Sequence, residues 1–133
     1  MSCPFFYPTE SRSADAVYPL GDWWMGRCYA DAAHPFGPAD LTPCNLGYAR
    51  GECACFPSGE GAGAAADAVR FAVASAAGTE VTLHWSIERD HYPVAHGTLA
   101  WERDAGFSDA PEGLLAPQAA AYIASYRRRK GEI

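Results

Sequence analysis

The stretch VTLHWSIE, Val81 to Glu88, decides the fold of this chain because its apolar and polar residues alternate strictly. A period of two places the apolar side chains on one face of a β-strand and the polar side chains on the other. Similar alternation surrounds Val69 and Phe71 before this stretch, and Leu99 and Trp101 after it. The three segments therefore predict strands of a half-buried sheet.

The connections between these segments are short. AAGTE and RDHYP are the lengths that antiparallel hairpins use, so we expect a three-stranded β-meander. A helix is the alternative for the segment around Val69, because several alanines lie there and alanine is the strongest helix former.

The C-terminal segment supplies a cover for one face of this sheet. Its apolar residues recur at helical spacing, at Leu115, Ala119, Tyr122, Ile123 and Tyr126. We expect Asp109 to cap this helix, with Glu112 three residues later, and Gly131 to end it. Pro117 either kinks the helix or marks its true beginning.

The N-terminal part of the chain reads as an irregular lobe. Prolines, which block long helices and break strands, occur there at positions 4, 8, 19, 35, 38, 43 and 57. The same segment is rich in aromatic residues and cysteines, which is unusual for a disordered arm and predicts order around a bound group. We expect the core to come mainly from the second half of the chain.

The predicted fold class is α+β, a small antiparallel β-meander covered by a C-terminal helix, with an irregular Cys-rich N-terminal metal-binding lobe. A length of 133 residues fits a single domain. Within it we expect the Cys-rich lobe over residues 1–57, a Gly/Ala-rich connector over 58–67, and the sheet plus helix over 68–131.

Charge and targeting signals narrow the class of protein. The formal net charge of −6 argues against a nucleic-acid partner. The N-terminus has no basic region followed by an apolar stretch, and no segment is long and apolar enough to span a bilayer, so we expect a cytoplasmic protein with no membrane partner. Disulfides are disfavoured in that compartment, which favours thiolate chemistry.

The cysteines are the strongest functional signal. They lie at Cys3, Cys28, Cys44, Cys53 and Cys55. Four thiolates from separate turns suit either a [4Fe–4S] cluster or a zinc ion, but the paired knuckles typical of structural zinc are absent. Pro4 after the first cysteine, nearby aromatic residues, and Arg27 and Arg50 favour the cluster. Buried thiols without a metal are the remaining alternative.

Several segments resemble a group of short uncharacterised bacterial proteins without an established activity. They are Cys3-Pro4-Phe5-Phe6, Gly26-Arg27-Cys28, the run CNLGYARG from Cys44 to Gly51 followed by Cys53, Phe56-Pro57, and Glu88-Arg89-Asp90-His91. The resemblance covers most of the chain and implies that Cys3, Cys28, Cys44 and Cys53 are the ligands, with Cys55 as an extra cysteine. Loop closure at Gly47 and Gly51 favours Cys53 over Cys55 as well.

Two functions follow from this set of cysteines. The first is a small iron–sulfur protein that binds one [4Fe–4S] cluster and serves electron transfer or redox sensing with a partner protein, without substrate chemistry of its own. The second is a non-redox binding or scaffold module with a structural zinc ion held by four cysteines.

Histidines and carboxylates offer a separate, weaker signal. The turn ERDHYPVAHG gathers Glu88, Asp90, His91 and His96, which suit metal binding or acid–base catalysis but also suit a solvated hairpin tip. His84 falls on the polar face of its strand, and His34 is an alternative fourth ligand in a zinc site of three cysteines and one histidine. Catalysis is the less favoured interpretation, because no nucleophile motif accompanies these residues.

Overall fold

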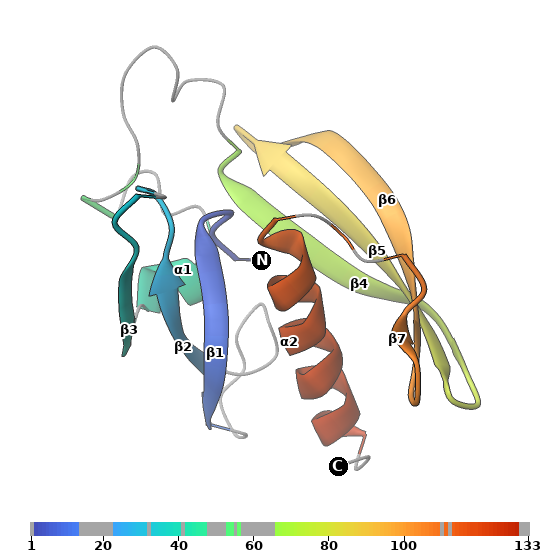
Figure 1. Cartoon of the computed structure of the whole chain (residues 1–133). Helices are drawn as coiled ribbons and strands as arrows, with labels where there is room; N and C mark the ends of the chain where they lie inside the picture. The colour runs from blue at the N-terminus through green and yellow to red at the C-terminus, as the bar shows by residue number, and fades with distance from the viewer. Residues whose placement is uncertain are drawn as a thin grey trace.

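The computed structural model describes residues 2–13, 23–31, 33–40, 42–47, 53–54, 56, 66–109, 111 and 113–130. These residues form two antiparallel sheets and a C-terminal helix, which confirms the α+β class. The helix α2 (Leu115–Arg129) lies between the two sheets (Figure 1). None of the described helices has the length and hydropathy needed to cross a bilayer.

The C-terminal sheet is the predicted meander with one short strand added. Its strands are β4 (Ala68–Ala77), β5 (Glu80–Arg89), β6 (Tyr92–Glu102) and β7 (Gly106–Phe107), paired in chain order. Leu83 lies opposite Val73 and Leu99, so the alternating apolar residues form one continuous face. The strand prediction for the segment around Val69 is confirmed, and the helical alternative is wrong.

The N-terminal part is not an irregular lobe, and this part of the prediction is wrong. It forms a three-stranded sheet from β1 (Phe6–Ser13), β2 (Trp23–Cys28) and β3 (Phe36–Asp40), followed by the short helix α1 (Thr42–Leu46). The order is β1-β2-β3, so Pro8 and Pro38 both lie on edge strands, where a missing N–H is tolerated. Pro43 lies in the first turn of α1, where the N–H has no helical acceptor.

The helix begins later than the sequence indicates. Asp109 does not cap it: α2 starts at Leu115 after Leu114, which has no capping side-chain bond. Gly113 takes a left-handed conformation with φ of 60°, so the chain turns between Asp109 and the helix. Pro117 therefore falls in the first turn and breaks no helical hydrogen bond. Glu112 and Gly131 lie outside the described residues.

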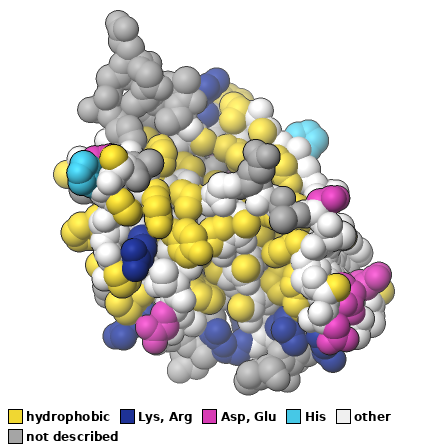
Figure 2. All heavy atoms as spheres, viewed as in Figure 1, with side chains coloured by type: hydrophobic (Ala, Val, Ile, Leu, Met, Phe, Trp, Pro, Cys, Tyr) yellow, Lys and Arg dark blue, Asp and Glu magenta, His cyan; other side chains and the backbone are white. Residues whose placement is uncertain are grey.

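The helix contacts a different sheet on each side. Toward the C-terminal sheet, Tyr122 packs against Phe71 with ring centroids 5.6 Å apart. Toward the N-terminal sheet, Trp24 donates an indole hydrogen bond of 3.2 Å to the hydroxyl of Ser125. The space-filling view shows hydrophobic side chains across the centre of this face of the molecule, with Lys and Arg side chains along its lower rim (Figure 2).

The buried residues form one core that both halves of the chain supply. Its members are Cys3, Phe6, Trp24, Cys44, Phe56, Val69, Phe71, Val81, Leu83, Leu99, Ala119, Ala121 and Ile123. Among the described residues, most of these members lie in the second half of the chain, which confirms that this half supplies the larger part of the core. The N-terminal sheet adds the rest, because it packs on the helix face that the sequence pattern left polar.

Candidate functional site

A tight turn from Cys3 to Phe6 lies between the two sheets, and we call it the Cys3–Phe6 turn. The N–H of Phe6 donates to the carbonyl of Cys3 at 3.1 Å. Just before it, Ser2 and Val69 exchange two backbone hydrogen bonds of 2.8 Å each, which ties the N-terminal segment to β4. Pro4 occupies the second position of the turn, where its fixed φ is favourable. The first cysteine is thus held rigidly.

Helix α2 fixes the same turn from the other side. Gln118 is fully buried, and its amide nitrogen donates to the carbonyls of Cys3 at 2.8 Å and Phe6 at 2.7 Å. Its amide oxygen accepts a bond of 2.9 Å from the hydroxyl of Ser2. Every amide atom of this side chain is therefore used to position the turn.

Cys44 lies against Cys3. The N–H of Cys3 donates to the carbonyl of Cys44 at 2.9 Å, and the two thiols are hydrogen-bonded. Both residues are buried, with 4% and 5% of their surface exposed. The hydrogen bond with Cys3, then burial, then repulsion from Cys3 raise the pKa of the Cys44 thiol far above its ordinary value. Two sulfurs therefore meet in a site from which water is excluded.

The helix that carries Cys44 is anchored by its neighbour Asn45. Its side-chain oxygen accepts from the N–H of Trp24 at 3.0 Å, and its side-chain nitrogen donates to the carbonyl of Trp24 at 2.8 Å. Asn45 is fully buried, so this pair of bonds joins α1 to β2 as a strand partner would.

Cys28 ends β2 beside the same turn. It pairs with Phe6 across the sheet and is half-buried. The next residue, Tyr29, donates its N–H to the carbonyl of Phe5 at 2.8 Å. The backbone of the third predicted ligand is therefore attached to the Cys3–Phe6 turn.

Cys53 begins a second turn of the same design. The N–H of Phe56 donates to the carbonyl of Cys53 at 3.2 Å, which repeats the bond between Phe6 and Cys3. Phe56 is buried and meets Phe5 edge-on, with ring centroids 5.5 Å apart. The two Cys-x-x-Phe turns thus pack against each other, a repeat that the sequence reasoning missed although the letters CPFF and CACF display it.

The four predicted ligands thus lie in or next to the Cys3–Phe6 turn and form no disulfide, and the side chains of Cys3 and Cys44 interact with each other. In the part of the chain that the structure describes, no three Cys, His, Asp or Glu side chains lie close enough together to hold a metal ion. Cys55 and Arg50 lie outside the described residues.

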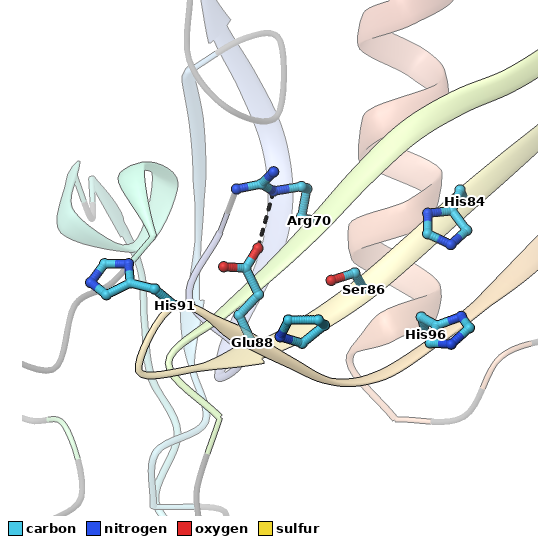
Figure 3. A pocket seen from close by; sticks show the side chains of 7 residues that line it. Arg70, His84, Ser86, Glu88, His91 and His96 are labelled. Atoms are coloured by element: carbon cyan, nitrogen blue, oxygen red, sulfur yellow. Dashed lines mark ion pairs between the residues drawn. The ribbon is translucent and has the colours of Figure 1, made fainter.

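A second group of polar residues lies on the face of the C-terminal sheet turned away from α2 (Figure 3). There they line a pocket of about 500 Å³, which we call the outer-face pocket. The residues that line it are Arg70, His84, Ser86, Glu88, His91, Pro93 and His96. Register explains the grouping, because Ser86 of β5 lies opposite Arg70 of β4 and opposite His96 of β6.

A buried carboxylate anchors one end of this pocket. The Glu88 side chain is only 7% exposed, and its Oε2 lies 3.1 Å from Nε of Arg70, which is itself half exposed. The ion pair compensates the negative charge of Glu88 and keeps Arg70 over the strand. The sequence pattern singled out Glu88 but not Arg70. Arg70 is identified by the pairing of β4 with β5, in which it lies opposite Ser86.

The β5–β6 turn at the rim of the pocket adopts an unusual backbone. Asp90 and His91 have φ angles of 52° and 68°, in the left-handed region that glycine and asparagine favour. The buried carboxylate of Asp67 holds the turn by accepting the N–H of Asp90 at 2.6 Å. His91 is thereby kept at the rim, apart from His84 and His96 (Figure 3).

Comparison with known proteins gives no relative from which a role can be transferred. No protein-family model, curated protein or solved structure matches this chain.

Proposed function

We propose that this chain is a small iron–sulfur protein that binds one [4Fe–4S] cluster through Cys3, Cys28, Cys44 and Cys53. The observation that carries the proposal is the buried thiol pair of Cys3 and Cys44, around which the backbones of the other two cysteines are fixed. A cubane cluster needs four thiolates from different segments of the chain. These four come from the N-terminus, β2, α1 and the Cys53–Phe56 turn.

The surroundings of the thiol pair suit a redox centre. Phe6 and Phe56 are buried beside it and limit the access of water, which is one determinant of a cluster's potential. Arg27 on β2 is exposed next to Cys28, where it offsets negative charge and faces a partner. With four thiolates no iron is open to a substrate, so the bound cluster would exchange single electrons with another protein.

The proposal requires a rearrangement when the cluster binds. The thiols of Cys28 and Cys53 must approach the pair formed by Cys3 and Cys44, and all four thiols must lose their protons to become thiolate ligands. Metal loading should therefore release protons and shift the Cys53–Phe56 turn.

A structural zinc ion bound by the same cysteines is the second candidate. The observation that favours it is the position of the thiol pair inside the core shared by both sheets, where an ion would brace the fold. In this case the chain is a binding or scaffold module without redox activity.

Anaerobic purification after expression with adequate iron distinguishes the two candidates. The cluster predicts a brown protein with about four irons and matching acid-labile sulfide per chain, bleached by dithionite. A colourless protein with one zinc per chain would support the structural ion instead, and a protein free of both metals would refute both proposals.

A further inference from the structure

His84 and His96 form a pair on the outer face of the C-terminal sheet. Their rings come from adjacent strands and lie with centroids 5.8 Å apart (Figure 3). His84 lies opposite Thr98 and His96 lies opposite Ser86, so the two histidines occupy diagonal positions on one face of the β5–β6 hairpin. Long side chains at such positions reach each other.

The backbone pairing of β5 with β6 fixes the positions of His84 and His96, independently of any contact between their side chains. From Glu80 to Ile87 the pairing of β5 with β6 runs without a register shift, so the two Cα positions are fixed by the sheet. Gly97, next to His96, has no Cβ, so the indole ring of Trp85 on β5 can pack closely against its backbone on β6. A site built on such rigid strands needs little reorganisation when it binds a ligand.

The two imidazoles have no other partner among the described residues, in which neither ring makes a hydrogen bond or an ion pair. The other charged groups of the pocket are already engaged, because Arg70 pairs with Glu88. Both histidines are exposed and open into the pocket of about 500 Å³. The free ring nitrogens are thus accessible to a ligand from solvent.

We propose that His84 and His96 form a binding site for a divalent transition-metal ion, separate from the cysteines. Imidazole nitrogens bind such ions at about 2.0–2.1 Å, which puts two ligand rings on one ion roughly 5 to 6.5 Å apart between centroids. The observed 5.8 Å falls within that range. Water or an exogenous ligand in the pocket completes the coordination, since Glu88 remains with Arg70. Zn²⁺, Cu²⁺ and Ni²⁺ are the ions that imidazole ligands suit.

A zinc titration followed by NMR tests this site directly. The chain has four histidines, so long-range ¹H–¹⁵N spectra of the imidazole rings contain four spin systems, which single substitutions assign. When several equivalents of Zn²⁺ are added to the purified protein, the ring signals of His84 and His96 should shift together, while the ring signals of His34 and His91 should not change. Reading the rings separates this site from zinc captured by thiols.

Matched variants complete the test. His84→Gln or His96→Gln should abolish the zinc-dependent shift of the remaining partner, whereas His34→Gln and His91→Gln should leave both shifts intact. His84→Thr, which suits a strand, replaces His84→Gln if the amide spectrum shows loss of the fold. Unmoved rings in the titrated protein, parallel shifts of all four rings, or a partner that still responds after His84→Gln would overturn the proposal.

Discussion

The thiols of Cys3 and Cys44 are hydrogen-bonded to each other, and the N–H of Cys3 also donates to the carbonyl of Cys44 at 2.9 Å. This double link brings the N-terminal segment and α1 together inside the core. In the metal-free protein, the Cys44 thiol therefore resists the loss of its proton.

The metal-free protein should lose stability in alkaline solution. The folded state raises the pKa of Cys44, so above the ordinary thiol range the unfolded chain releases a proton that the folded chain keeps. The free energy of unfolding then falls as pH rises, by at most about 1.4 kcal/mol per pH unit. Urea denaturation with chelator and reductant between pH 8 and 9.5 measures this slope.

Cys44→Ser should remove that alkaline slope, and Cys55→Ser should keep it. Burial raises the pKa of Tyr122 as well, so above about pH 10 this residue also lowers the free energy of unfolding. The two variants are therefore compared below that pH. An equal slope in Cys44→Ser would show that the thiol pair does not cause it.

Gln118→Leu should lower the free energy of unfolding by about 3 kcal/mol. The variant leaves two buried carbonyls, those of Cys3 and Phe6, without their donor, and the Ser2 hydroxyl without its acceptor. Chemical denaturation compares it with Ala120→Ser, an exposed change on the same helix that should cost less than about 0.5 kcal/mol. Equal stability of the two variants would contradict the role given to Gln118.

The hydrophobic pattern of the sequence predicted the C-terminal meander and one face of the helix, but not the helix face that contacts the N-terminal sheet. The meander was predictable because one of its faces is apolar and the other polar. The helix stripe that includes Tyr122 was predictable for the same reason. The opposite helix face carries Gln118 and Ser125, which contact the N-terminal sheet through hydrogen bonds and leave no apolar periodicity.

The prolines misled the prediction for the N-terminal half. A proline excludes a central strand, but Pro8 and Pro38 lie on the edge strands, and sequence alone does not show which strands are edges. The outer-face pocket was only partly predictable. The turn at Asp90 brings β5 and β6 together, but the register shift between Ile87 and Glu88 is what places His96 opposite Ser86, and the pairing with β4 adds Arg70.

Gly26→Ala should destabilise the protein by about 3 kcal/mol or more. A Cβ at this position would overlap the carbonyl oxygen of Tyr7 and the ring of Phe6, and a backbone atom of a paired strand cannot move aside cheaply. Gly97→Ala provides the comparison, since its Cβ would lie 2.8 Å from the half-buried Trp85 ring, which can shift at a cost of about 1 kcal/mol. Thermal unfolding ranks the two, and a smaller loss for Gly26→Ala would contradict the close approach of β1 and β2.

His91→Gly should stabilise the protein by about 0.5–1 kcal/mol. The left-handed backbone of His91 is strained for a residue with a Cβ, and glycine relieves this strain at some cost in chain entropy. His34→Gly, at a position without a left-handed backbone, should be neutral or destabilising under the same urea denaturation. A destabilised His91→Gly would mean that the imidazole contributes more than the strain costs.

The iron and acid-labile sulfide content of five single Cys→Ser variants, purified anaerobically in parallel, tests the central claim most directly. Cys3→Ser, Cys28→Ser, Cys44→Ser and Cys53→Ser should each lose most of the metal, because each removes one of the four proposed thiolates. Cys55→Ser should keep about four irons per chain. Full iron content in Cys44→Ser, or its loss in Cys55→Ser with retention in Cys53→Ser, would contradict the proposed ligand set.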